Sequence, residues 1–165
     1  MTRQPMLTQS APTPLLTAAT LPDYLQQRAA SRMGLSLADR RIAVDENAIT
    51  FPTDPDIQIG AVEAGGVPSE WQVPPGAEGG RCLLYFHGGG YVFGSATSHR
   101  HLTSKLAQLA GMRCLSVSYR LAPENPYPAA VEDAMAAYRW LLDQGISAQD
   151  IAVAGDSAGG GLAVA

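Results

Sequence analysis

Short apolar runs alternate with helix-length segments through the second half of this chain, and this order restricts the possible folds more than any other feature. The apolar runs are 82–86, 112–119 and 151–154, and they are separated by segments 98–110 and 128–143. In the second segment, apolar side chains recur with the period of 3.6 residues that is typical of an amphipathic helix. The alternation predicts βαβ units, in which buried strands form a parallel sheet covered by helices.

The first half of the chain is more polar and more frequently interrupted. Residues 1–20 have no clear period, and a helix is expected over about Pro22 to Met33, with Gly34 at its end. A polar connector is expected next. The alternation over 57–63 predicts a strand, and Gly65-Gly66 predicts a turn into a returning strand over 67–73. We therefore expect a loose segment at 1–20, a helical region at 21–50 and an α/β core at 51–165.

The pentapeptide Gly-Asp-Ser-Ala-Gly at 155–159 stands directly after the apolar run 151–154 and before a segment that can begin a helix. A strand, a sharp turn and a helix are the context of a nucleophile elbow, in which Ser157 would project its Oγ above the sheet. The N–H of Ala158 would then point at a developing oxyanion. A glycine-rich turn or a phosphate loop is the alternative, but a P-loop ends in Lys-Ser/Thr and a Rossmann fingerprint needs glycine where Ser157 stands.

A second glycine-rich motif, His87-Gly88-Gly89-Gly90-Tyr91, follows the apolar run 82–86. Glycines leave backbone N–H groups uncovered and allow close approach to a substrate, so Gly88, Gly89 and Gly90 are candidate oxyanion-hole donors. His87 is expected to orient this loop through hydrogen bonds rather than to act as a general base. A flexible hairpin or loop is the alternative reading.

Other polar residues are expected to be structural. Arg120 and Glu124 could pair across a turn, and Asp133 could be mistaken for a catalytic acid. His99 and His101 form an isolated His-x-His pattern with no third ligand in view, so we expect a solvent-facing helix start and no metal site.

Composition excludes several classes of function. The chain has 165 residues, a net charge of −4 and 46% hydrophobic residues, which suits one domain with a real core. An acidic chain with a pI near 5.2 is not expected to bind nucleic acid or an anionic membrane. Prolines interrupt the N-terminal segment, so we expect no signal peptide, no membrane span and a cytoplasmic location in which Cys82 and Cys114 are buried thiols.

The three stretches His-Gly-Gly-Gly-Tyr at 87–91, Tyr-Arg-Leu-Ala-Pro-Glu at 119–124 and Gly-Asp-Ser-Ala-Gly-Gly at 155–160 together resemble the hormone-sensitive-lipase-like esterases of the alpha/beta hydrolase fold-3 family. This resemblance implies an α/β-hydrolase fold with a mostly parallel sheet, flanking helices and an N-terminal helical cap that roofs the acyl pocket. It also implies that Ser157 is the nucleophile and that Asp156 fills an acidic position beside it without being the triad acid. The substrates would be small carboxylic esters, and no cofactor would be needed.

In the family that the chain resembles, the catalytic acid and histidine follow the serine along the chain, whereas all three histidines here precede Ser157. We therefore expect an N-terminal fragment of an esterase that has negligible turnover by itself. A ligand-binding module on the same scaffold and a gene remnant without function are the alternatives. The sequence leaves the oligomeric state open.

Overall fold

The computed structural model describes residues 17–165 except 32, 50 and 78. The chain forms two compact units, residues 1–35 and 36–165. In the first unit, α1 (Leu21–Ser31) confirms the helix expected there. The loose segment expected at 1–20 lies mostly outside the described residues. Gly34 has φ of 82°, a conformation that favours glycine after a helix end.

The polar connector expected after Gly34 is wrong, because α2 (Leu37–Ile49) occupies most of it. Ser36 accepts a hydrogen bond from the backbone N–H of Asp39 at 3.2 Å and donates one to the Asp39 carboxylate at 2.7 Å. This exchange is a helix-capping pattern, and it explains why a polar stretch forms a helix. The contacts place α2 in the second unit, whereas the sequence grouped 21–50 together.

The second unit is built on a mixed five-stranded sheet in the order β1-β2-β4-β3-β5. The strands are β1 (Gln58–Ala64), β2 (Val67–Val73), β3 (Cys82–Phe86), β4 (Arg113–Val117) and β5 (Ile151–Gly155). The hairpin β1-β2 forms as expected and joins β4 in antiparallel orientation. The strand β3 pairs in parallel with both β4 and β5.

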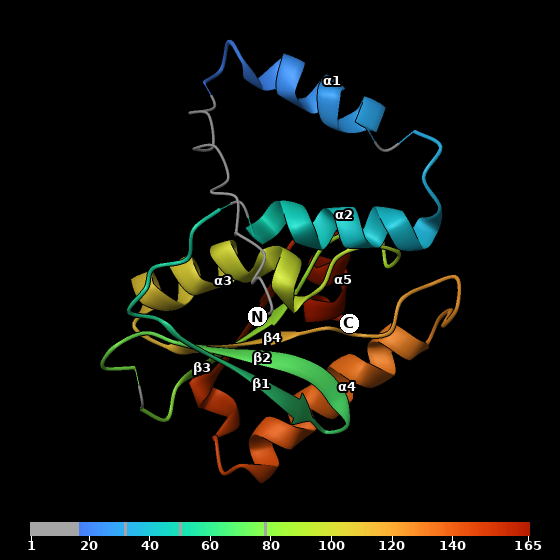
Figure 1. Cartoon of the computed structure of the whole chain (residues 1–165). Helices are drawn as coiled ribbons and strands as arrows, with labels where there is room; N and C mark the ends of the chain where they lie inside the picture. Colours follow the sequence, from blue (N-terminus) through green and yellow to red (C-terminus); the bar gives the residue numbers. More distant parts are fainter. Residues whose placement is uncertain (1–16, 32, 50, 78) are drawn as a thin grey trace, which may run out of the picture. The chain divides into compact units, whose positions relative to one another are not determined.

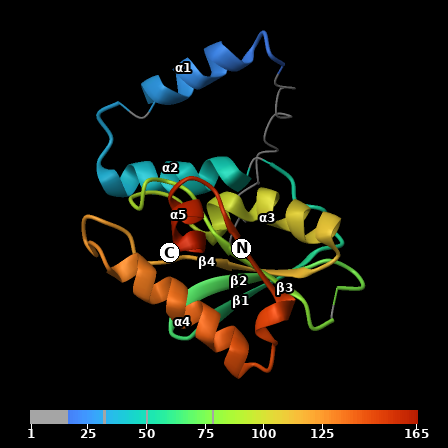
Figure 2. The ribbon, with the colours of Figure 1, turned by 180° about the vertical axis from the view of Figure 1, so that it is seen from behind.

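Helices cover both faces of this sheet, as Figure 1 shows for α3 (Ala96–Ala110) and α4 (Ala129–Asp143). Seen from behind in Figure 2, β5 leads through a short turn into α5 (Ala158–Val164). The α/β-hydrolase architecture expected from the resemblance is therefore confirmed, but the expectation of a mostly parallel sheet is wrong. The sheet is mixed, because the hairpin β1-β2 joins β4 in antiparallel orientation while β3 pairs in parallel with β4 and β5.

Two apolar clusters explain why the strands read as continuous apolar runs. Cys82, Leu84 and Phe86 of β3 face the cluster that contains residues of α4 and α5, whereas Leu83 and Tyr85 face the cluster beneath α3. Each central strand is thus buried on both faces. The helix α2 packs on α3 within this unit.

The core position Leu115 offers a test of this packing, because its side chain is fully buried in β4. We expect Leu115→Ala to lower the free energy of unfolding by about 2–5 kcal/mol through the lost burial and the cavity left behind. The matched change Leu109→Ala, at a side chain that is 75% exposed in α3, should cost less than about 0.5 kcal/mol. Urea denaturation of both variants measures the difference, and equal losses would contradict this description of the core.

Candidate active site

Two loops meet at one edge of the sheet because β3 and β5 are parallel neighbours. Phe86, the last residue of β3, is in register with Gly155, the last residue of β5. The segments that follow these strands, His87–Tyr91 and Asp156–Ala158, therefore leave the sheet side by side. The carboxyl ends of parallel strands are the usual location of binding sites in open α/β sheets.

Ser157 occupies a strained turn between β5 and α5. Its φ is 49° and its ψ is −116°, a region that non-glycine residues rarely adopt, and the residue is exposed. Such a conformation costs on the order of 1–3 kcal/mol and is typical of functional sites. Ser157 thus lies in a sharp strand-to-helix turn, the elbow formed by residues 155–159.

The glycines that flank Ser157 are required by close backbone packing. A Cβ on Gly159 would lie 2.7 Å from the carbonyl oxygen of His87 and closer still to that of Phe86. A Cβ on Gly155 would lie 2.6 Å from the Phe86 carbonyl oxygen. The elbow therefore packs directly against the end of β3, and side chains at these two positions would push the loops apart.

The Asp156 carboxylate connects the elbow to the glycine loop. Its Oδ1 accepts hydrogen bonds from the backbone N–H of Gly88 at 2.7 Å and from the Tyr85 hydroxyl at 3.0 Å. A Cβ on Gly88 would collide with this carboxylate. The N–H of Gly88 is thus already engaged, whereas none of the hydrogen bonds identified among the described residues uses the N–H of Gly89 or Gly90.

The loop itself makes a tight turn with three consecutive positive φ values, 123° at Gly89, 63° at Gly90 and 61° at Tyr91. The carbonyl oxygen of Gly89 accepts hydrogen bonds from the N–H groups of Val92 at 3.1 Å and Phe93 at 3.0 Å. These bonds set the direction of the peptide groups on either side of Gly89.

His87 is completely buried below this loop. Its ring stacks on Tyr119 with centroids 4.3 Å apart and planes at 9°, and its Nδ1 donates to the Gly88 carbonyl oxygen at 2.8 Å. The Tyr119 hydroxyl donates to the His87 carbonyl oxygen at 2.6 Å. Burial lowers the pKa of His87 from 6.5 to about 4, so the ring is neutral near pH 7.

The expectation that His99 and His101 share a solvent-facing helix start is wrong for His99. That side chain is partly buried, with Nε2 3.4 Å from Asp156 Oδ1 and its ring centroid 5.5 Å from that of His87. His101 is exposed and contacts the Pro52 carbonyl oxygen at 2.9 Å. Within the described ranges, no group of three or more His, Cys, Asp or Glu residues is arranged to hold a metal ion.

The expected pairing of Arg120 with Glu124 is also wrong. Arg120 instead binds Asp133 through its backbone N–H at 2.7 Å and its Nε at 2.9 Å, and it contacts Glu132 as well. Glu124 pairs with Arg41 of α2, at 2.9 Å. Asp133, which is buried, therefore braces the segment after β4, as the structural interpretation predicted. Arg120 and Glu124 are only four residues apart, but the turn directs Arg120 toward α4 and Glu124 toward α2, so they do not pair.

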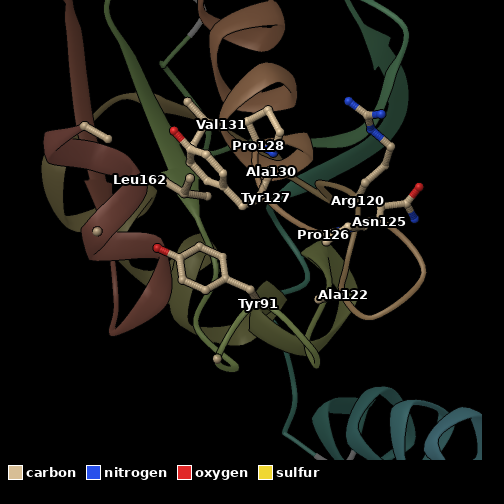
Figure 3. Close-up of a pocket in the computed structure, with 13 residues that line it drawn as sticks. Tyr91, Arg120, Ala122, Asn125, Pro126, Tyr127, Pro128, Ala130, Val131 and Leu162 are labelled. Atoms are coloured by element: carbon tan, nitrogen blue, oxygen red, sulfur yellow. The ribbon is translucent and has the colours of Figure 1, made fainter.

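A mostly apolar cavity of about 500 Å³ lies beside the glycine loop. Figure 3 shows the rings of Tyr91 and Tyr127 together with Leu162 and Val131 around it. Gly90 and Gly161 also line this space, so it adjoins both the loop and the first turns of α5.

Comparisons with known proteins identify the family to which this fold belongs. Residues 83–165 match the family described as alpha/beta hydrolase fold, and the chain belongs to this family. An acetyl-hydrolase of Streptomyces hygroscopicus is 51% identical over 126 residues, which are 76% of this chain and 42% of the relative. An ethyl acetate hydrolase of Pseudomonas putida is 54% identical over 88 residues, covering 51% of this chain and 28% of the relative.

Solved structures agree with this assignment. An esterase from the bacterial hormone-sensitive lipase family matches with a TM-score of 0.82 and 43% identity, covering 91% of this chain and 51% of that one. A hormone-sensitive lipase from a metagenome library matches with a TM-score of 0.77 and 43% identity, covering 86% of this chain and 49% of that one. The resemblance to hormone-sensitive-lipase-like esterases is therefore confirmed, and the chain spans about half the length of such proteins or less.

Among the residues described, no helix is both long enough and apolar enough to cross a bilayer.

The buried His87 predicts a pH dependence of stability. Its pKa is lowered in the folded state, so the unfolded chain binds the proton first as the pH falls below 6.5. The contribution of neutral, buried His87 to the free energy of unfolding is fully present above pH 6.5 and is lost progressively as the pH falls toward 4. The difference between 6.5 and about 4 corresponds to on the order of 3 kcal/mol. Urea denaturation from pH 7 to pH 4 should give a flatter profile for His87→Gln than for the wild type, and profiles of equal slope would contradict this account of the buried ring.

The packing of the elbow predicts that Gly159→Ala is destabilising. The added methyl group meets the backbone carbonyls of Phe86, the last residue of β3, and of His87 directly after it. These groups cannot move without disturbing the sheet, so we expect a loss of about 1–3 kcal/mol or more. Gly79→Ala, where a Cβ meets nothing within 4 Å, is the matched control and should be nearly neutral. Thermal unfolding followed by circular dichroism compares the two, and a neutral Gly159→Ala would show that the elbow has room that this geometry denies.

Proposed function

We propose that this chain carries the nucleophile half of a serine carboxylic ester hydrolase, with Ser157 as the attacking residue. The observation that carries this proposal is the strained backbone of Ser157, with φ of 49° at the turn between β5 and α5. The strain costs free energy and is retained in a turn that leaves the serine exposed. A glycine-rich turn without function would need no serine at the strained position.

The oxyanion that forms when Ser157 attacks an ester would be bound by the N–H groups of Gly89, Gly90 and Ala158. The N–H of Gly88 is bound to Asp156, so we assign Gly88 to the joint between loop and elbow rather than to the oxyanion. Loss of one oxyanion donor costs roughly 10²- to 10³-fold in rate in a serine hydrolase. His87 and Asp156 would act as supporting residues that hold the loop at the correct distance from the nucleophile.

The general base and its orienting acid would come from a segment that corresponds to the unmatched half of the relatives. The three histidines of this chain already contact other groups. His87 Nδ1 is bound to the Gly88 carbonyl oxygen, His101 to the Pro52 carbonyl oxygen, and His99 lies next to Asp156. In the proposed reaction, the base accepts the proton of Ser157 Oγ as the oxygen attacks the ester carbonyl. The alcohol then leaves with that proton, and water hydrolyses the acyl-enzyme.

The proposed substrates are small carboxylic esters, and the reaction requires no cofactor. Two relatives are named acetyl-hydrolase and ethyl acetate hydrolase, which supports short acyl groups. The apolar cavity beside Gly90 offers space for the hydrocarbon part of an ester. We also propose a cytoplasmic location, which suits Cys82 and Cys114, two buried cysteines that are both free.

A chimeric enzyme tests this proposal. Residues 1–165 would be joined to the remainder of the Streptomyces hygroscopicus acetyl-hydrolase, beyond the region that matches. We expect this chimeric enzyme to hydrolyse p-nitrophenyl acetate and Ser157→Ala to abolish the activity. The chain of 165 residues alone should show negligible turnover, since removal of the base costs on the order of 10⁶-fold in a comparable serine hydrolase.

The control variant is Ser147→Ala, which changes an exposed serine outside the site and should leave the rate unchanged. A folded chimeric enzyme that keeps its activity in Ser157→Ala would contradict the assignment of the nucleophile. A folded one that binds an ester without turning it over would favour the ligand-binding alternative.

A further inference from the structure

The helix α2 reaches the glycine loop through Arg41, although the two are about fifty residues apart in the sequence. Arg41 Nε donates to the Val92 carbonyl oxygen at 2.8 Å, and Nη2 donates to the Ala122 carbonyl oxygen at 2.7 Å. The guanidinium therefore bridges two segments. One is Val92–Ser95, the arm that leads from the glycine loop to α3, and the other is the turn that follows β4. A planar group with five donors in fixed directions suits this arrangement, whereas lysine could satisfy only part of it.

Glu124 fixes the direction of this guanidinium. Its two carboxylate oxygens accept from Arg41 Nη1 at 3.0 Å and Nη2 at 2.9 Å. These bonds lower the pKa of Glu124. An exposed ion pair contributes little stability by itself, so its main effect here is to orient Arg41 toward the two carbonyl groups.

A second contact from α2 holds the other end of the same arm. Asp45 Oδ1 accepts a hydrogen bond from the Ser95 hydroxyl at 2.6 Å. Ser95 is also the N-cap of α3, where its side chain accepts from the N–H of Ser98. The arm Val92–Ser95 is thus attached to α2 at both of its ends.

The position of this arm determines the direction of the proposed oxyanion donors. The carbonyl oxygen of Gly89 accepts from the N–H groups of Val92 and Phe93, and Tyr91 accepts from the N–H of Ala122 at 2.8 Å. A displacement of Val92 would therefore turn the peptide groups of Gly89 and Gly90.

We propose that Arg41 is a positioning residue of the oxyanion loop, and that α2 is part of the scaffold of the active site rather than only a cover over it. This inference rests on the proposed function for the role of the loop. The attachment itself is a property of the chain alone. Its test can therefore be separated from the test of esterase activity.

Hydrogen exchange on the 165-residue chain, followed by NMR or by mass spectrometry of a peptide covering 88–95, tests the attachment. In Arg41→Met, the charge-assisted hydrogen bonds from the guanidinium to the carbonyl oxygens of Val92 and Ala122 are lost. The arm then opens more often, so the amides of Val92 and Phe93 should exchange about 10- to 100-fold faster. Peptides from β3 and β4 should exchange as in the wild type. Arg139→Met, the same change at an exposed arginine of α4, is the control and should leave the loop unaffected.

Unchanged exchange at Val92 and Phe93 in Arg41→Met would overturn the inference. If Arg41→Met accelerates exchange throughout the chain, Arg41→Lys decides the matter. That variant keeps the charge and can reach one carbonyl group, so an intermediate increase confined to 88–95 supports the inference. No increase, or an increase throughout the chain, overturns it.

The chimeric enzyme provides the readout that separates positioning from stability. Arg41→Met should lower kcat about 10- to 100-fold with little change in KM, because a misplacement of about 1 Å can cost about 10²-fold. Arg41→Lys should recover part of the loss. An inactive wild-type chimeric enzyme would count against the proposed function alone, whereas an active one with unchanged kcat in Arg41→Met would overturn the positioning role.

Discussion

The parallel pairing of β3 with β5 is the constraint on which the rest of the site depends. It brings Phe86 level with Gly155, so that the glycine loop and the elbow begin at the same edge with almost no space between them. The absence of side chains at Gly155 and Gly159 permits this approach, because a Cβ at either position would meet backbone of β3 or of the elbow itself. A wider separation would leave the proposed oxyanion donors out of reach of Ser157.

Hydrogen bonds to the Asp156 carboxylate fix the position of the glycine loop relative to the elbow. It accepts from Gly88 of one loop while it belongs to the other, and it also accepts from Tyr85 of β3. An acceptor shared by both loops limits how far they can move relative to each other. The same bond removes Gly88 from the set of free donors, so the loop offers two consecutive N–H groups rather than three. The strained Ser157 therefore lies between two fixed groups: the helix α5 follows it, and the Asp156 carboxylate bound to Gly88 precedes it.

Local patterns were sufficient to predict most of the elements. The strands β3 and β4 appeared as apolar runs because both of their faces are buried. The edge strand β5 is apolar although it is partly exposed, and α4 appeared through its period. The helix α2 was missed because it is polar and its signal is the exchange between Ser36 and Asp39 rather than an apolar stripe. His99 was assigned to solvent because its neighbour Asp156 lies far away in the sequence and is brought close only by the fold.

The sequence by itself determined the order along the chain of the strands and of every helix except α2, together with the positions of the glycine loop and of the turn at Ser157, because these depend on the period, size and flexibility of neighbouring residues. Only the tertiary structure decided which polar groups meet. It joined Gly88 to Asp156, Arg120 to Asp133 and Arg41 to Glu124, each across many residues. Short-range patterns do not carry this information, since hydrogen bonds depend on distances and directions that arise only when the sheet has assembled.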